Sequence, residues 1–346
     1  MALAAARDHP HRSRWTARAG LAVSAAAVGW GIRHRSSPAV RCWRRGGGAQ
    51  RTAGELSVRS AGGGHRAVVL LHGLTANGDF FGAGYDLLAD DAQLAIPDLR
   101  GFGRSLDVHS GGHSLDAHLA ALDLMARELQ LDGRELTVAG HSFGALLALH
   151  WAARRSDVVR VVCFGAPLYA DSREADERIA AMGRMEQLFA PQGSVSRAVC
   201  GWMCRNRAIA QWVAVAIEPR LPVAIARMAV LHSWASYLGA MNSVIRRAAW
   251  QTPLAALDAA GVTVLLADGA RDPVPSPGRT SELATRYANV AIATHATAGH
   301  HLPITHPSWC VNLLTDQRGH EHHDDRPGGS PRDRSRGYGW NSGRRL

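Results

Sequence analysis

One serine of the chain has the surroundings that a nucleophile needs. Residues 140–144 read Gly-His-Ser-Phe-Gly and match the pattern G-x-S-x-G. In this pattern the serine, here Ser142, occupies a strained turn between a strand and a helix, which lifts its hydroxyl above the sheet. Gly140 and Gly144 leave room where side chains would collide. The pattern alone is weakly specific, but the apolar run LTVA before it and the helical pattern ALLALHWAARR after it provide the required setting.

Further motifs follow in a fixed order over residues 52–315, and together they resemble the α/β-hydrolase family. His72-Gly73-Leu74 follows the apolar run AVVLL, as the family's HG loop does, and residues 98–105 look like its D-x-R-G-x-G-x-S segment. Residues 268–275 resemble the loop that supplies the acid, although the proline comes early, and Gly299-His300 resembles the pair that supplies the base. Several matches in one order are far more specific than any single match.

This resemblance implies a serine hydrolase with the chain order Ser142, Asp272, His300. His300 would take the proton of the Ser142 hydroxyl during attack and return it to the leaving group, while Asp272 would orient the imidazole. The backbone N–H groups of Leu74 and Phe143 would receive the developing oxyanion. The expected reaction is the cleavage of a carboxylic ester or thioester through an acyl-enzyme, on a small apolar or lipid-like substrate.

Neighbouring residues compete for two of these roles. His301 could replace His300 as the base, and Asp268 or Asp171 could replace Asp272 as the acid. The family motif favours His300, because it directly follows glycine, and Asp272, because it lies in the loop that must reach across from the strand end.

Three more residues lie inside these motifs. Asp98 is expected to bond loop backbone and not to act in catalysis. His72 and His141 are expected to line the mouth of the substrate pocket as packed, hydrogen-bonded histidines and not as acids or bases.

A mostly parallel, doubly wound sheet is needed to position these residues. Short β-rich runs alternate with longer helical patterns, which is typical of an α/β fold with helices on both faces of the sheet. Strands are expected at residues 55–59, 66–71, 93–97, 135–140, 158–164, 262–267 and 289–295. Helices are expected at residues 114–130, 143–154, 278–288 and 306–315.

Residues 168–250 interrupt this alternation of strands and helices, and their sequence predicts helices. They contain five of the seven methionines. We expect an inserted helical cap over the site, and Met182, Met185 and Trp234 would give it an adaptable apolar pocket. The alternative is that these side chains only pack the cap onto itself.

The net charge of +10 is concentrated in two tails. Residues 1–51 hold ten Arg and one Asp, and residues 316–346 hold seven Arg and five acids, so the middle is close to neutral. No motif for reading nucleic acid is present, which argues against such a partner. The tail at 316–346 is expected to be disordered.

Residues 21–32 form an apolar run that is too short to span a bilayer. Three interpretations of residues 1–51 stay open: a disordered or wrongly annotated extension, a weak membrane tether, and an export signal.

The sequence predicts no cofactor and no metal. It has no P-loop, and none of its five cysteines has CxxC spacing, which favours a reducing, cytoplasmic compartment. Two alternative functions stay open: a non-catalytic ligand-binding protein on the same fold, and a C–C hydrolase, perhydrolase or acyltransferase that reuses the same residues.

Overall fold

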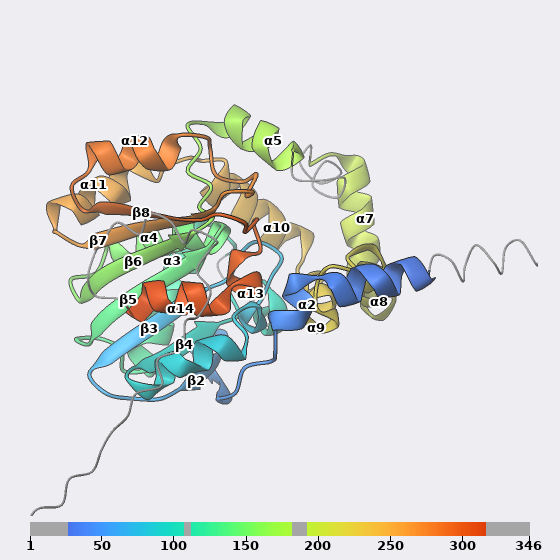
Figure 1. Cartoon of the computed structure of the whole chain (residues 1–346), viewed down its shortest axis with the longest axis horizontal. Coiled ribbons are helices and arrows are strands. Elements are labelled where there is room, and N and C mark those ends of the chain that lie inside the picture. Colours follow the sequence, from blue (N-terminus) through green and yellow to red (C-terminus); the bar gives the residue numbers. More distant parts are fainter. Residues whose placement is uncertain (1–26, 107–111, 182–191, 316–346) are drawn as a thin grey trace, which may run out of the picture.

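The computed structural model describes residues 27–106, 112–181 and 192–315, and a mixed sheet forms its centre (Figure 1). In these residues the sheet has eight strands in the order β1-β2-β4-β3-β5-β6-β7-β8. β1 and β2 pair antiparallel, and β2 pairs antiparallel with β4, while every other pairing is parallel. The strands are β1 Ala49–Ala53, β2 Leu56–Ala61, β3 Arg66–Leu71, β4 Gln93–Pro97, β5 Glu135–His141, β6 Val158–Phe164, β7 Thr263–Gly269 and β8 Val290–His295. The predicted mostly parallel α/β sheet is confirmed.

Helices cover both faces of the sheet, so alternate residues of one strand enter two different cores. In β3, Val69 and Leu71 join one hydrophobic cluster, and Val68 and Leu70 join the other. Buried parallel strands read as continuous apolar runs for this reason. The helices around the sheet are α3 Leu115–Glu128, α4 Phe143–Ala152, α11 Gln251–Ala259, α12 Arg279–Arg286, α13 Leu302–Thr305 and α14 Pro307–Thr315, with 3₁₀ turns η1 Gly78–Phe80, η2 Ala83–Asp90 and η3 Gly103–Ser105.

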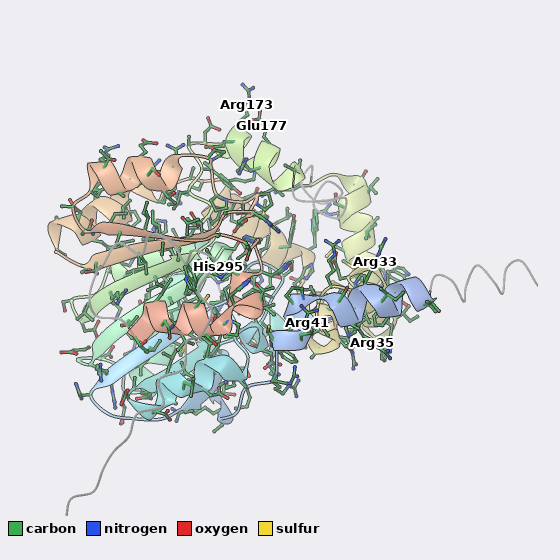
Figure 2. All side chains as sticks on the ribbon, in the orientation of Figure 1. Arg33, Arg35, Arg41, Arg173, Glu177 and His295 are labelled. Atoms are coloured by element: carbon green, nitrogen blue, oxygen red, sulfur yellow. The ribbon has the colours of Figure 1, made fainter. Side chains whose placement is uncertain are left out.

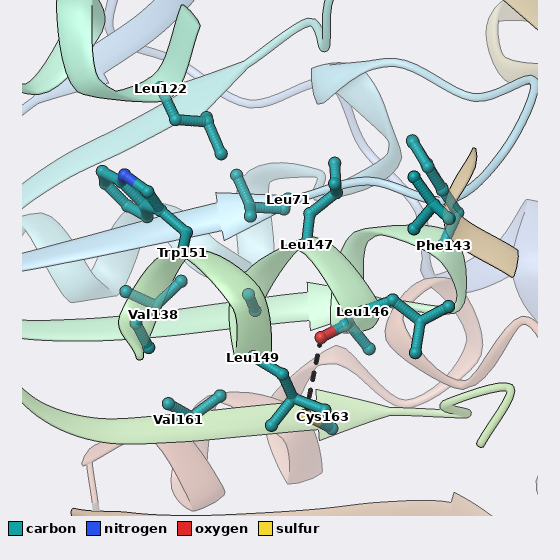
Figure 3. Packing of buried hydrophobic residues seen from close by; sticks show 14 of the residues in the cluster. Leu71, Leu122, Val138, Phe143, Leu146, Leu147, Leu149, Trp151, Val161 and Cys163 are labelled. Carbon is teal, nitrogen blue, oxygen red and sulfur yellow. Dashed lines mark hydrogen bonds between the residues drawn. The ribbon is translucent and has the colours of Figure 1, made fainter. Parts of the chain in front are cut away.

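The helix α4 is the centre of the larger cluster. Figure 3 shows its apolar side chains packed over Leu71 of β3, Val138 of β5 and Val161 of β6. Trp151, near its C-terminal end, is fully buried, and its indole N–H donates to Asp123 Oδ1 at 2.8 Å. Full burial of one large apolar side chain stabilises by roughly 1.5–3 kcal/mol, and nine of the ten α4 residues are buried, so packing fixes the position of α4 on the sheet.

The residues between β6 and α11 form the helical insertion (residues 168–250). Its described elements are α5 Ser172–Ala180, α7 Ser194–Arg205, α8 Arg207–Ile217, α9 Val223–Met228, α10 Trp234–Ala240 and the π-helical turn η4 Met241–Ile245. The predicted helical character therefore holds in the described part. The insertion contacts the carboxyl edge of the sheet, where the loop after β4 pairs Phe102 with His232 and the Gly103 N–H donates to Leu231 O at 2.9 Å.

The N-terminal boundary differs from the expectation of a separate extension through residue 51. β1 begins at Ala49, and residues 27–36 and α2 (Pro38–Cys42) are helical. The Trp30 indole N–H donates to Val215 O at 3.0 Å, so this segment packs against the insertion. These contacts could not be predicted from the arginine-rich sequence of the segment, because its charged side chains stay exposed while Trp30 points toward the insertion. Residues 1–26 and 316–346 lie outside the described residues, and no helix in the described ranges has the length and apolar character to cross a membrane.

Candidate active site

The turn between β5 and α4 has the strained backbone that a nucleophile elbow requires. Ser142 has φ 54° and ψ −117°, a region that few residues other than glycine adopt. Its N–H donates to Phe164 O at 2.8 Å, which ties the turn to the end of β6. A Cβ on Gly140 would lie 2.1 Å from Gly144 O, and one on Gly144 would lie 2.3 Å from Leu71 O. Both glycines are therefore required by close backbone approach, as the motif predicts.

A carboxylate and an imidazole pair at the ends of β7 and β8. His300 Nδ1 lies 2.9 Å from Asp272 Oδ2 and 3.0 Å from Oδ1. The Arg271 N–H donates to Ala298 O at 2.9 Å, so the two loops are bonded to each other through the backbone. The Asp272 carboxylate is 1% exposed, and as an acceptor it favours the imidazole tautomer with the proton on Nδ1, which leaves Nε2 free to accept a proton.

Gly165 connects this pair to the serine turn. It follows Phe164, the residue whose carbonyl accepts from Ser142, and it has φ 57°. A Cβ at Gly165 would lie 2.7 Å from Asp272 Oδ2 and 3.1 Å from His300 Nδ1. Gly165 was not predicted from the sequence, although a glycine directly after an apolar strand is a signal that could have indicated it.

Ser142 and His300 lie at the same edge of the sheet without a direct bond. Both residues are described, and no hydrogen bond joins the Ser142 hydroxyl to the His300 imidazole. Bonds between a nucleophile and its base are commonly long without substrate and tighten in the substrate complex.

His141 is a packed histidine that contacts His300, and its place at the mouth of the substrate pocket stays a prediction. Its Nε2–H donates to the backbone carbonyl of His300 at 2.7 Å, and the two ring centroids are 4.6 Å apart. The His141 ring also stacks on Phe80. The residue is only 4% exposed, so its side chain is shielded from solvent. Burial, together with the nearby charge of His300, lowers the pKa of His141 well below its ordinary value, so the ring stays neutral.

His72 is a packed, hydrogen-bonded histidine, as expected, and its place at the mouth of the substrate pocket stays a prediction. Its side chain is fully buried. Its Nδ1–H donates to Gly73 O at 2.8 Å, and its Nε2 accepts the Leu99 N–H at 2.8 Å. Burial lowers its pKa, which keeps the ring neutral and both bonds intact. His72 thus braces the loop that carries Leu74 against the loop after β4.

The backbone N–H groups of Phe143 and Leu74 donate to no acceptor within a described helix or strand. Phe143 is the first residue of α4, so its N–H has no intrahelical acceptor. Leu74 lies in the loop after β3, and its N–H donates to no backbone carbonyl among the described residues. Asp98 holds the neighbouring loops, since its carboxylate accepts the Gly78 N–H at 2.7 Å and the Arg104 N–H at 2.6 Å. The expected structural role of Asp98 is confirmed.

The alternative carboxylates, Asp171 and Asp268, do not pair with His300. Asp171 caps the N-terminus of α5 by accepting a backbone N–H there. Asp268 lies in β7, and burial, with the neighbouring Asp272 charge, raises the pKa of its carboxyl to about 7. The hydrogen bonds of His300 Nδ1 go to Asp272 alone among the described carboxylates, which makes Asp272 its partner.

The predicted pocket residues of the insertion are only partly described. Trp234 begins α10, stacks on Tyr237 with ring centroids 5.8 Å apart, and lines a surface hollow of about 510 Å³ between α7 and α10. Ser142 is not among the described residues that line this hollow. Met182 and Met185 lie outside the described residues. Within the described ranges no group of three or more His, Cys, Asp or Glu could hold a metal ion.

The strand order and the strained serine between β5 and α4 define an α/β-hydrolase. The family model described as "Serine aminopeptidase, S33" matches residues 64–304, and the chain belongs to this hydrolase family.

Two curated proteins are similar to part of the chain. It is 27% identical over 159 residues to the probable lysophospholipase BODYGUARD 4 of Arabidopsis thaliana, a match that covers 42% of this chain and 37% of the relative. It is 34% identical over 130 residues to the lipase LipV of Mycobacterium tuberculosis, with 37% of this chain and 48% of the relative covered. The chain thus spans less than half the length of each of these relatives.

Solved structures share the fold at low sequence identity. An esterase from Thermogutta terrifontis has a TM-score of 0.52 at 21% identity, covering 75% of this chain and 91% of that chain. An esterase from Exiguobacterium antarcticum has a TM-score of 0.55 at 18% identity, with 78% and 98% covered. The enol-lactonase from Burkholderia xenovorans has a TM-score of 0.56 at 16% identity, with 77% and 98% covered.

Proposed function

We propose that this protein is a serine hydrolase that cleaves a carboxylic ester or thioester of a small apolar or lipid-like substrate. The observation that carries the proposal is the buried Asp272–His300 pair, with 2.9 Å between Oδ2 and Nδ1, at the sheet edge where Ser142 occupies its strained turn. The names of the two curated relatives, a lysophospholipase and a lipase, favour lipid-like esters among the possible substrates.

In this mechanism the Ser142 hydroxyl attacks the carbonyl carbon of the substrate while His300 Nε2 accepts its proton. The proton then passes to the leaving alcohol or thiol, and an acyl-enzyme remains. Water, activated by the same imidazole, attacks the acyl group and releases the acid. Asp272 stabilises the imidazolium in both steps through the bond to Nδ1.

The negative charge that develops on the carbonyl oxygen needs donors that are in place before the reaction. The N–H groups of Leu74 and Phe143 would supply them, and the loss of one such donor costs about 3–4 kcal/mol of transition-state stabilisation. His72 contributes through Leu74, because its two backbone bonds hold the loop that presents this N–H. The helical insertion would act as the cap that selects the substrate.

The decisive test labels the nucleophile. Wild-type protein should react with a fluorophosphonate probe and hydrolyse p-nitrophenyl esters of short and medium acyl chains. Ser142→Ala should lose labelling and about 10⁴-fold or more of the hydrolysis. Ser281→Ala, which changes an exposed serine on α12, is the matched control and should keep both. Full hydrolysis by Ser142→Ala would rule the mechanism out, and unlabelled wild-type protein that binds but never turns over esters would favour a ligand-binding protein.

Two further pairs of variants assign the acid and the base. Asp272→Asn should lower kcat by about 10⁴-fold, because the imidazole loses its orienting acceptor. Asp268→Asn, four residues earlier on the same strand and loop, should change kcat much less. In the same way His300→Gln should abolish turnover and His301→Gln should not. An equal loss in either pair contradicts the proposed assignment.

A further inference from the structure

The helix α8 carries a large exposed apolar surface. Its sequence RAIAQWVAVAI contains no acidic residue. Four of its large apolar side chains are 44–60% exposed, at spacings that put them on one side of a helix: Ile209, Trp212, Val213 and Ile217. Single exposed apolar residues are ordinary, but a contiguous apolar helix face on a folded protein marks an interaction surface.

The helix at residues 27–36 lies beside α8 and carries exposed apolar side chains of its own. The Trp30 indole donates to Val215 O at 3.0 Å, and His34 Nδ1 lies 2.9 Å from Pro219 O, so these two residues form the inner face of the helix. Val28 and Ile32, one turn apart on the other face, are 62% and 64% exposed. Figure 1 shows the two helices together at one end of the molecule, outside the sheet. We call these six exposed residues of the two helices the apolar patch.

Positive charge predominates around the apolar patch, although the exposed Glu218 directly follows Ile217. Residues 27–51 and 192–217 contain nine Arg and no Asp or Glu. Figure 2 shows Arg33, Arg35 and Arg41 on the two N-terminal helices at this end of the molecule, and the Arg227 guanidinium lies 5.1 Å from the centroid of the Trp212 ring. The chain that precedes the patch, residues 1–26, adds four Arg and one Asp in sequence.

We infer that the apolar patch docks this protein on the surface of an anionic lipid bilayer. Apolar and tryptophan side chains of α8 and the helix at 27–36 would enter the boundary between headgroups and acyl chains, while the surrounding arginines contact anionic headgroups. The negative potential of such a surface attracts arginine side chains that lie close to it. A second copy of this chain fits the patch less well, because a twofold contact would set these arginines against one another.

This inference concerns where the protein sits and not what it cleaves, so it is testable apart from the proposed chemistry. Full-length protein is mixed with phosphatidylcholine vesicles or with vesicles of equimolar phosphatidylcholine and phosphatidylglycerol, and the vesicles are sedimented. Wild-type protein should partition onto the anionic vesicles and much less onto the neutral ones, and added salt should weaken the partition. Ser142→Ala should partition like the wild type, since the nucleophile has no role in docking.

Two substitutions in the patch test the apolar contribution. Trp212→Gln combined with Ile217→Gln should lower the partition onto anionic vesicles about tenfold or more. Ile292→Gln on β8 is the matched control, because Ile292 is 41% exposed and lies on the sheet away from the patch, and it should bind like the wild type. Circular dichroism and the hydrolysis of a soluble ester show that each variant is folded.

A second pair of variants tests the charge. Arg33→Gln combined with Arg35→Gln should lower the partition about tenfold, and Arg173→Gln on α5, which Figure 2 shows at another part of the surface, should leave it unchanged. The inference is overturned if wild-type protein stays in solution with anionic vesicles, or if the patch variants bind as well as the controls. It is also overturned if the patch variants convert a dimer into a monomer in light scattering and leave the vesicle partition unchanged, because the occupant is then a second copy.

Discussion

The helices α4 and α8 are similar in composition and opposite in burial. α4 buries nine of its ten residues, whereas α8 buries three of its eleven. α4 packs against β5 and β6 on one side and against α3 and α11 on the other, so the chain itself covers its apolar surface (Figure 3). α8 contacts α7, α9 and the helix at 27–36, which leaves its remaining face in solvent. An apolar helix therefore indicates that a surface will be covered, but it does not indicate by what.

The difference in burial also predicts how the stability of each region responds to substitutions. The sheet and its helices share two continuous clusters, so the removal of one side chain there weakens the whole fold. The helix α8 instead packs in a small separate cluster through Ala210 and Ala214, and a single indole bond joins it to Trp30, so we expect α8 to open locally without global unfolding.

The largest expected effect compares two tryptophans. Trp151→Ala should lower the free energy of unfolding by about 3–5 kcal/mol, because it leaves a cavity in a fully buried site and an unpaired Asp123. Trp212→Ala removes a side chain that is 60% exposed and should change stability by less than about 0.5 kcal/mol. Urea denaturation measures both. Equal losses would show that α8 is covered within the folded chain.

Next in size is a comparison of two helical glycines. Gly144→Ala would put a Cβ 2.3 Å from Leu71 O, and backbone cannot yield easily there. We expect a loss of about 1–3 kcal/mol and, because the elbow moves, about 100-fold lower ester hydrolysis. Gly201→Ala in α7 meets only the flexible end of Arg205, at 3.4 Å, and should stabilise the helix by up to about 1 kcal/mol. Normal hydrolysis by Gly144→Ala contradicts the close approach.

A third effect is a pH dependence that arises in the body. Burial raises the folded-state pKa of Asp268 to about 7, whereas an unfolded aspartate ionises near 4. The stability contributed by the protonated carboxyl is therefore complete below about pH 4 and is lost as the pH rises through about 7. Asp268→Asn should flatten this decline in melting temperature. Glu177→Gln, at an exposed ion pair with Arg173 on α5, should leave the decline in place, and an unchanged profile in Asp268→Asn would contradict the assignment.

The smallest effect concerns the contact between the N-terminal segment and the insertion. Trp30→Phe removes the indole bond to Val215 O and should cost about 0.5–1.5 kcal/mol locally. Hydrogen exchange should speed up in α8 and stay unchanged in α4. Trp43→Phe, whose indole bond at 2.9 Å goes to Asp79 O in the body, is the control and should leave the exchange of α8 unaltered. Faster exchange in α4 after Trp30→Phe would show that the two regions unfold together.

The strands of the central sheet were predictable because burial on both faces leaves a continuous apolar run. β3 and β4 begin and end at the expected residues, 66–71 and 93–97. β1 was missed, because it is an edge strand with the sequence AQRTA, of which only Ala53 is buried. The helix at 27–36 was missed for a related reason: its inner contacts are made by the polar atoms of Trp30 and His34 with backbone carbonyls, which leave no apolar period.

The sequence by itself determined the elbow at Ser142, because so tight a turn between strand and helix admits only glycine on either side, and this requirement is local. The sequence favoured Asp272 over Asp268, but only the tertiary structure shows the bond from Asp272 to His300, the backbone groups that His72 joins, and the open face of α8. Each of these depends on how distant strand ends and helices meet in space. Spacing along the chain carries no information about that, because residues four apart on one strand end can point to different partners.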